Sequence, residues 1–186
     1  MPELSDVSYK KHIMKLYNEP SYVKTYDRRY NTIQLAKYMT VLPSLTNNTG
    51  WILDVGIGTG LFLKKVVRQW ALIVGIDLSL NMLRLAKKRA KNYINVELIL
   101  ADADHLPFKE NTFPTITAFT ILQNMPDLSK TLTEIIRVSE GVVAITVLKR
   151  KIDEAALQKL LQRLGVKEFE VIETESEDIF AVYYVN

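Results

Sequence analysis

Residues 51–60 read Trp-Ile-Leu-Asp-Val-Gly-Ile-Gly-Thr-Gly, a short apolar run broken by three alternating glycines. An apolar run of this length predicts a buried strand, and the glycines predict a tight turn into a helix, expected over Leu61–Trp70. A glycine-rich turn between a strand and a helix lets a ligand approach bare backbone N–H groups. The segment therefore predicts the first strand and the ligand-binding turn of an α/β fold.

Strand and helix patterns alternate after this turn. Further strands are expected at Leu72–Ile76, Val96–Leu100, Thr115–Leu122 and Val142–Leu148, with helices from Ser79 to about Lys91, after Asp127 and over Ala156–Leu164. The segments Phe169–Thr174 and Ile179–Val185 predict a β-hairpin. Strands that alternate with helices imply right-handed crossovers. We therefore expect a Rossmann-like, doubly wound, mostly parallel sheet with a C-terminal antiparallel hairpin.

The tyrosine-rich N-terminal segment is predicted to be helical. Leu35, Tyr38, Met39 and Leu42 follow the spacing i, i+3, i+4, i+7, which forms an apolar stripe that Pro43 ends. No linker or internal repeat divides the chain. We expect one domain over residues 1–186, in which residues 1–45 form a helical cap.

Composition excludes several classes of protein. The chain has 186 residues, 48% hydrophobic and 24% charged, which is ordinary for a globular domain. No apolar run approaches the ~18–20 residues that span a bilayer, and residues 1–15 lack the apolar core of a signal peptide. Because cysteine is absent and His12 and His105 are the only histidines, we expect a cytoplasmic protein without disulfides, a metal centre or a membrane anchor.

The glycine turn differs from two common phosphate-binding loops. A dinucleotide fingerprint requires a third glycine where Leu61 stands, which argues against a nicotinamide-dependent oxidoreductase. A P-loop requires Gly-Lys-Ser/Thr at its end, and Lys64 comes too late. The acidic Asp54 at the entrance of the turn suits a ligand that carries an amino group.

Four blocks of the sequence resemble class I S-adenosylmethionine (SAM)-dependent methyltransferases, in the broad group that methylates small molecules, quinone precursors and some tRNA bases. The blocks are Leu53–Gly60, Ile73–Ser79, Ala101–Phe108 and Phe119–Asp127, and each follows or ends an expected strand. They occur in the family's order and at its spacing, over roughly residues 50–148. The resemblance implies the class I methyltransferase fold, SAM as cofactor and transfer of a methyl group.

The resemblance also implies a set of cofactor-binding residues. Asp54 with Gly56, Gly58 and Gly60 would hold the methionine end, Asp77 the ribose hydroxyls, Leu78 and Met82 the adenine faces, and Asp102 and Ala103 the adenine edge. Phe119 and Thr120 would lie beside the methyl group. Tyr26 and Tyr30 are candidates to cover the cofactor, and Gln123 and Asn124 are candidates to touch the substrate. No residue is assigned as a catalytic base.

Charge is unevenly distributed along the chain, although the net charge is only +3. Between Leu61 and Lys91 the basic residues are Lys64, Lys65, Arg68, Arg84, Lys87, Lys88, Arg89 and Lys91, against the single acid Asp77. The C-terminal segment from Val166 is acidic. A small-molecule acceptor is favoured, while RNA, a protein acceptor and a catalytically inactive SAM-binding partner subunit stay open. The acceptor atom and the oligomeric state have no signature in the sequence.

Overall fold

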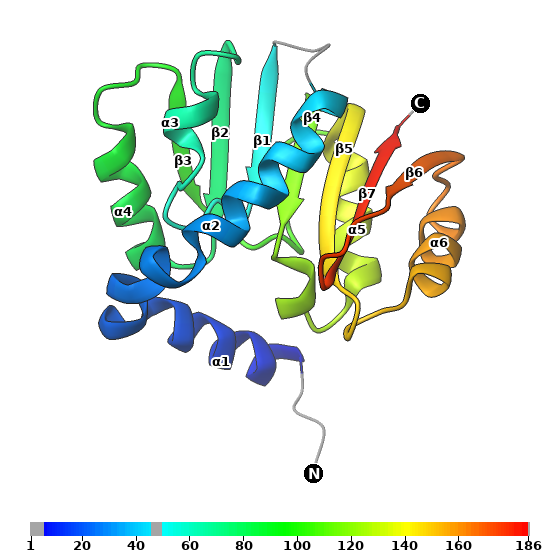
Figure 1. Cartoon of the computed structure of the whole chain (residues 1–186), viewed down its shortest axis with the longest axis horizontal. Helices are drawn as coiled ribbons and strands as arrows, with labels where there is room; N and C mark the ends of the chain where they lie inside the picture. Colours follow the sequence, from blue (N-terminus) through cyan, green and yellow to red (C-terminus); the bar gives the residue numbers. More distant parts are fainter. Residues whose placement is uncertain (1–5, 46–49, 186) are drawn as a thin grey trace.

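The structure, a computed structural model, describes residues 6–45 and 50–185, and its centre is one seven-stranded sheet (Figure 1). The strand order is β3-β2-β1-β4-β5-β7-β6. The strands are β1 (Trp51–Val55), β2 (Leu72–Asp77), β3 (Val96–Leu100), β4 (Phe113–Phe119), β5 (Ser139–Leu148), β6 (Glu168–Ile172) and β7 (Asp178–Tyr184). The first five pair in parallel, whereas β7 is antiparallel to both β5 and β6. The predicted sheet and its antiparallel hairpin are confirmed.

Helices cover both faces of this sheet. The helices are α1 (Asp6–Asn18), α2 (Pro20–Leu45), α3 (Leu63–Val66), α4 (Leu80–Ala90), α5 (Leu128–Val138) and α6 (Glu154–Arg163), with a short 3-10 helix η1 (Leu122–Asn124). Side chains of α2, α3 and α4 share one apolar core with the sheet, and those of α5 and α6 share another. Neighbouring residues of a strand serve opposite cores, since Ile52 belongs to the first and Leu53 to the second. The fold is therefore a three-layer arrangement with the sheet in the middle.

The buried face of α2 differs from the predicted apolar stripe. Its buried residues are Val23, Gln34, Lys37, Tyr38, Val41 and Leu45, while Met39 is 53% exposed. Tyr38 of the predicted stripe is buried and Leu42 packs against the core, so the prediction is wrong only in part. It missed Gln34 and Lys37, two polar side chains that occupy the inward face. The helix also continues through Pro43, which stands in its last turn, where the missing N–H removes only one hydrogen bond near the helix end.

The helix expected at Leu61–Trp70 is much shorter, because only Leu63–Val66 is α-helical. The side-chain amide of Asn95 donates to the carbonyl of Val67 at 2.8 Å and to that of Trp70 at 2.9 Å. These bonds satisfy carbonyls at the end of the segment without a further helical turn. Trp70 is still buried, so the segment packs against the sheet as irregular turns.

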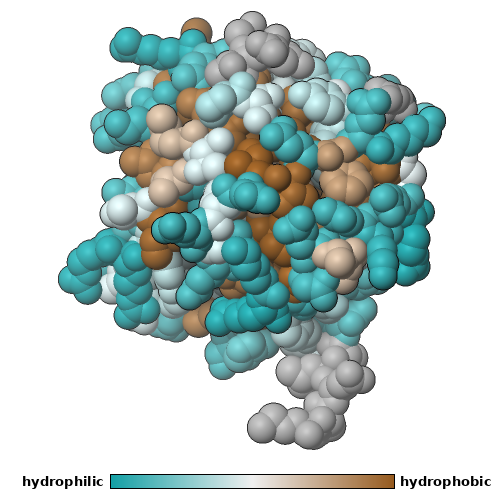
Figure 2. All heavy atoms as spheres, turned by 45° about the vertical axis from the view of Figure 1, so that its right-hand side comes forward, coloured by the Kyte–Doolittle hydropathy of each residue, from teal (hydrophilic) through white to brown (hydrophobic). Residues whose placement is uncertain are grey.

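The surface is mostly hydrophilic, with apolar side chains exposed in the centre of the face drawn in Figure 2. The large apolar residues that are exposed on the molecule include Ile33, Met39 and Tyr184. Among residues 6–45 and 50–185, no helix has the length and apolar character needed to cross a membrane. The basic helix α4 packs on β2 and β3, whereas the acidic β6 forms the opposite edge of the sheet.

Candidate active site

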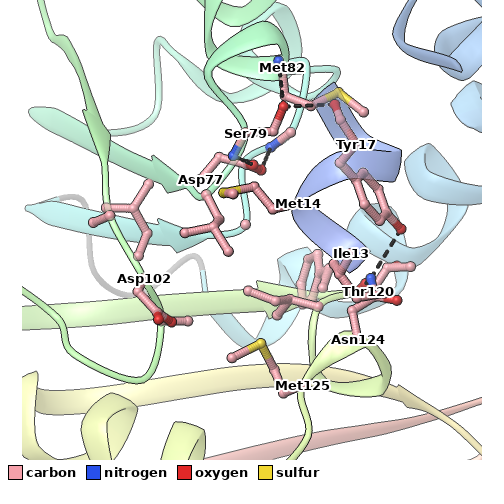
Figure 3. A pocket seen from close by; sticks show the side chains of 18 of the residues that line it. Ile13, Met14, Tyr17, Asp77, Ser79, Met82, Asp102, Thr120, Asn124 and Met125 are labelled. Carbon is pink, nitrogen blue, oxygen red and sulfur yellow. Dashed lines mark hydrogen bonds between the residues drawn. The ribbon is translucent and has the colours of Figure 1, made fainter. Parts of the chain in front are cut away.

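A cavity lies at the carboxyl ends of β1, β2 and β4, where the chain order of the sheet reverses direction (Figure 3). Ligands of doubly wound sheets bind at this switch point. The sheet side of the cavity includes the first two glycines of the loop and Asp77. The roof comes from α1, whose Ile13, Met14 and Tyr17 line the same cavity.

The structure brings most of the predicted site residues to this cavity. Those that line it are Gly56, Gly58, Asp77, Leu78, Met82, Asp102, Ala103, Phe119, Tyr26 and Asn124. Asp54 lines an adjoining smaller cavity, together with Gln34 and Thr59. Gly60, Tyr30 and Gln123 line neither of these two cavities.

The glycine loop is held by its own backbone. The N–H groups of Gly56 and Gly60 donate to the carbonyls of Ile76 and Ile57, at 2.9 and 3.0 Å. Gly58 has a φ of 58°, and a Cβ atom on it would meet only the Gly56 carbonyl oxygen, at 3.9 Å. A Cβ on Gly60 would instead lie 2.8 Å from a side-chain carbon of Leu63. Gly58 therefore leaves room for a ligand, whereas Gly60 is required for packing.

Asp77 ends β2 and joins the glycine loop to the start of α4. One carboxylate oxygen accepts from the Gly58 N–H at 2.9 Å, and the other accepts from the Ser79 N–H at 2.7 Å. Burial raises the pKa of Asp77 to about 6, although both N–H groups act in the opposite direction. Ser79 caps α4 as predicted, because its hydroxyl accepts from the Met82 N–H at 3.1 Å.

Asp54 is a buried carboxyl at the other end of the site. Burial raises its pKa to about 7, and the negative charge of Asp77 acts in the same direction. The Thr117 hydroxyl donates to it at 3.0 Å, which lowers the pKa in part. A cationic ligand group in the adjoining cavity would stabilise the ionised form of Asp54.

Asp102 is engaged by a residue that sequence reasoning missed. The ammonium of Lys10 in α1 lies 2.7 Å from both carboxylate oxygens of Asp102 and 2.5 Å from Asp104. Burial acts to raise the pKa of Asp102, but the hydrogen bond and charge of Lys10 outweigh it and hold the pKa below its usual range. These ion pairs tie the roof of the cavity to its floor.

Four tyrosines form a cluster beside the cavity. The rings of Tyr22, Tyr26 and Tyr30 follow one face of α2. The ring centroids of Tyr22 and Tyr26 are 6.0 Å apart, and those of Tyr26 and Tyr30 are 4.8 Å apart. The ring centroid of Tyr17 in α1 lies 5.3 Å from that of Tyr22. Burial raises the pKa of Tyr17, Tyr22 and Tyr26, so these phenols stay protonated at neutral pH. Tyr26 and Tyr17 reach the cavity, whereas Tyr30 does not line it and contacts Tyr26 with its ring tilted by 50°.

The turn after β4 brings a further polar group to the cavity. The side-chain amide of Asn124 donates to the Tyr17 hydroxyl at 3.1 Å and to the Thr120 carbonyl at 3.2 Å (Figure 3). Thr120 has a φ of 61°, which is unusual for a β-branched residue and marks a constrained turn. Thr120 lines the cavity beside Phe119, as the family resemblance implied. Ile13, Met14 and Tyr17 were not predicted to line it, because apolar or single polar residues carry no motif. Within the described residues, no group of three or more His, Asp or Glu side chains is placed to hold a metal ion.

The fold and the position of the cavity define the class I methyltransferase fold. Residues 52–140 match the family described as a methyltransferase domain. The structure superimposes on magnesium protoporphyrin IX methyltransferase from Synechocystis with bound SAM at a TM-score of 0.79, with 15% identity and 100% coverage of both chains. A DhpI complex with S-adenosylhomocysteine (SAH) gives a TM-score of 0.81, with 17% identity and coverage of 96% and 98%.

Sequence relatives are quinone methyltransferases. Demethylmenaquinone methyltransferase of Staphylococcus saprophyticus is 36% identical over 121 residues, which cover 61% of this chain and 52% of the relative. The enzyme of the same name from Staphylococcus aureus is 35% identical over 123 residues, covering 62% of this chain and 51% of the relative. The matched part therefore spans about half the length of these relatives.

Proposed function

We propose that this protein transfers a methyl group from SAM to a small-molecule acceptor. The observation that carries the proposal is the cavity at the carboxyl ends of the parallel strands, into which the glycine loop, Asp77 and Asp102 converge. The methyltransferase domain over residues 52–140 and the SAM and SAH complexes of structural neighbours support it. We further propose that residues 1–186 act as one domain in the cytoplasm, since a chain without cysteine has no need of an oxidising compartment.

The proposed binding mode uses the predicted residues. The Asp77 carboxylate already accepts two backbone N–H groups, and its remaining lone pairs would accept the two ribose hydroxyls. Leu78 and Met82 would pack on the adenine, and Ala103 would meet its edge. Asp102 would accept the adenine amine, which requires that it share its oxygens with Lys10. Gly56, Gly58, Asp54 and Phe119 would surround the methionine end.

The chemistry requires alignment more than activation by the protein. SAM supplies a methyl group already activated by the sulfonium, and the bond to sulfur breaks as the acceptor's lone pair attacks. The roof residues of α1 exclude water from this reaction. The nearby phenols stay protonated, so Tyr17 and Tyr26 act as hydrogen-bond donors and aromatic surface. The acceptor itself must therefore present a nucleophilic atom.

The size and polarity of the site favour a small acceptor. The roof and the far wall are apolar at Ile13, Met14 and Met125, and the polar groups near them are the uncharged Tyr17 and Asn124. A planar or apolar molecule fits such walls, as the demethylmenaquinone named for the sequence relatives would. We propose this class of acceptor for the same site.

Methyl transfer from labelled SAM into fractionated cell extract tests the proposal. We expect label in a low-molecular-mass fraction and one-to-one binding of SAM and SAH, without binding of NAD. Label in the RNA or the protein fraction would show that the acceptor is RNA or protein and not a small molecule. Tight SAM binding with no transfer to any fraction would favour the inactive partner subunit.

A further inference from the structure

A buried polar network lies directly behind the proposed methyl-donor site. The ammonium of Lys37 in α2 lies 2.8 Å from the carboxylate of Asp178 in β7, and the two side chains are only 5% and 4% exposed. The same ammonium lies 3.0 Å from the hydroxyl oxygen of Thr120, and that hydroxyl lies 3.0 Å from the side-chain oxygen of Gln34. The network therefore runs from a C-terminal strand, through a helix, to the turn that follows β4.

The chemistry of the donors fixes the direction of each hydrogen bond. An ammonium can only donate, so the Thr120 hydroxyl accepts from Lys37. The hydroxyl proton of Thr120 is then free to be donated to the side-chain oxygen of Gln34. The Gln34 amide is thereby oriented, with its oxygen toward Thr120 and its NH₂ group turned away from it.

The NH₂ group of Gln34 is available to a ligand. Gln34 is 6% exposed and lines the smaller cavity, which also contains Asp54 and the glycine loop. No partner of this NH₂ group occurs among the described residues. The nitrogen is not among the fully buried side-chain atoms that lack a partner, so it is accessible from the cavity and can donate to a ligand there.

The three glycines of the loop, unlike Gln34, have no N–H group free for a ligand. The N–H groups of Gly56, Gly58 and Gly60 are all donated to acceptors of the protein itself. These three N–H groups are therefore not free for a ligand carboxylate. The Gln34 NH₂ group lies in the same cavity as Asp54, the acid that suits an ammonium.

We propose that Gln34 binds the α-carboxylate of the amino-acid end of SAM while Asp54 binds its ammonium group. Lys37 and Asp178 act as positioning residues, because they hold Thr120 and so orient the Gln34 amide. The inference rests on the proposed function, and it assigns to α2 a part of the cofactor site that lies outside the four sequence blocks.

The variant Gln34→Glu tests the assignment with two ligands. Glutamate keeps the oxygen that accepts from Thr120 and replaces the NH₂ group with a second oxygen, at nearly the same size. SAH has the amino-acid carboxylate and ammonium, whereas 5′-deoxy-5′-methylthioadenosine keeps the adenine, the ribose and a methylthio group but has no amino-acid part. Calorimetry should show SAH affinity about 10- to 100-fold weaker, the size of a lost hydrogen bond to a charged group. Affinity for methylthioadenosine should stay within about twofold.

The double variant Lys37→Met with Asp178→Asn tests the positioning role without leaving a buried unpaired charge. With the ammonium gone, the Thr120 hydroxyl is free to turn, and SAH affinity should fall severalfold while methylthioadenosine binding persists. If the ratio of SAH affinity to methylthioadenosine affinity is the same in this variant as in the wild-type protein, Lys37 and Asp178 do not position Gln34.

The outcomes separate this assignment from the proposed function. Suppose that the wild-type protein binds both ligands. If Gln34→Glu then lowers the affinity for both ligands equally, or for neither of them, the carboxylate assignment is overturned while SAM binding stands. If the wild-type protein binds neither ligand, the proposed function falls and the assignment falls with it.

Discussion

Asp54 and Asp77 are buried carboxyl groups whose pKa values are raised to about 7 and about 6, chiefly by burial. Both values lie above 3.8, the ordinary value that the unfolded chain would show. Between about pH 4 and 7 the folded protein therefore binds more protons than the unfolded chain. The free energy of unfolding contributed by these groups is fully present at the acid end and decreases as the pH rises through this window.

The first prediction concerns this pH dependence. In the unliganded protein, Asp54→Asn should flatten the decrease in unfolding free energy between about pH 4 and 7, because asparagine keeps an acceptor for Thr117 and cannot ionise. Urea unfolding at a series of pH values measures it. Asp102 and Glu134 have lowered pKa values, so their contribution to the unfolding free energy increases with pH. That increase occurs mainly below this window. An unchanged slope in the variant would contradict the raised pKa of Asp54.

The second prediction uses Gly58, which lines the cavity and where an added Cβ would meet one protein atom at an ordinary contact distance. Gly58→Ala should weaken SAM binding by tenfold or more, because the new methyl group enters the space of the ligand. Gly165→Ala is the matched control, since Gly165 has a φ of 88° and no atom near its absent Cβ, but lies at the end of α6. Each variant should lose ~1–2 kcal/mol of stability from left-handed backbone strain.

Calorimetry and urea unfolding of the same two variants separate the effects. Equal SAM affinity in Gly58→Ala and Gly165→Ala would exclude the glycine loop from the cofactor site.

At the scale of elements, α1 is held in place mainly by polar contacts. It contributes no buried residue, and its contacts include the Lys10 ion pairs, hydrogen bonds at its end and the ring of Tyr17 against Tyr22. The Ser79 hydroxyl donates to the Tyr17 carbonyl at 2.7 Å, and the Asn81 amide donates to the Asn18 carbonyl at 2.6 Å. The second half of α2, in contrast, packs Tyr38, Val41 and Leu45 into the core. A movable roof would therefore consist of α1 and not of all the N-terminal helices.

The third prediction concerns hydrogen exchange of this roof. We expect amides of α1 to exchange faster than those of β1 and β4 without ligand, and to become protected when SAM is bound, because SAM would pack beneath Met14 and Tyr17. Amides in the second half of α2 should change little. Lys10→Gln should speed exchange in α1 further. Identical exchange of α1 with and without SAM would indicate a fixed cap.

At the scale of the whole molecule, charge is separated across the sheet. Basic side chains of α3 and α4 surround a surface hollow that includes Lys64, Lys88 and Lys91, at the side opposite to the acidic β6. Not all of the basic residues are free, because Arg89 pairs with Asp27 of α2 and donates to the Thr59 carbonyl. These lysines lie outside the residues that line the proposed methyl-donor cavity.

The fourth prediction follows from that separation. If the acceptor is a small molecule, binding to bulk tRNA should be weak and vanish at about 0.1 M salt, where surface charges are screened over ~10 Å. Filter binding across a salt series measures it, with Lys88→Glu as the control for charge. Appreciable affinity with a log–log slope of about −3 or steeper would indicate several phosphate contacts and favour an RNA acceptor.

Local patterns in the sequence determined the sheet, the glycine turn and the placement of acidic residues at strand ends. Asp77 and Asp102 follow apolar runs, and the carboxyl ends of parallel strands meet at one edge, so their approach to a common cavity could be predicted. The caps at Ser79 and Asp127 were also predictable, since each involves an N–H group within three residues.

Only the tertiary structure decided which residues complete the site. Lys37 and Asp178 are 141 positions apart, and Lys10 and Asp102 are 92 apart, so no local spacing relates them. Lys37 and Gln34 are polar side chains on the inward face of α2, so the apolar pattern predicted that face only in part. A polar side chain can be buried only when a partner from another element meets it, and the packing of α1, α2 and β7 against the sheet supplies those partners.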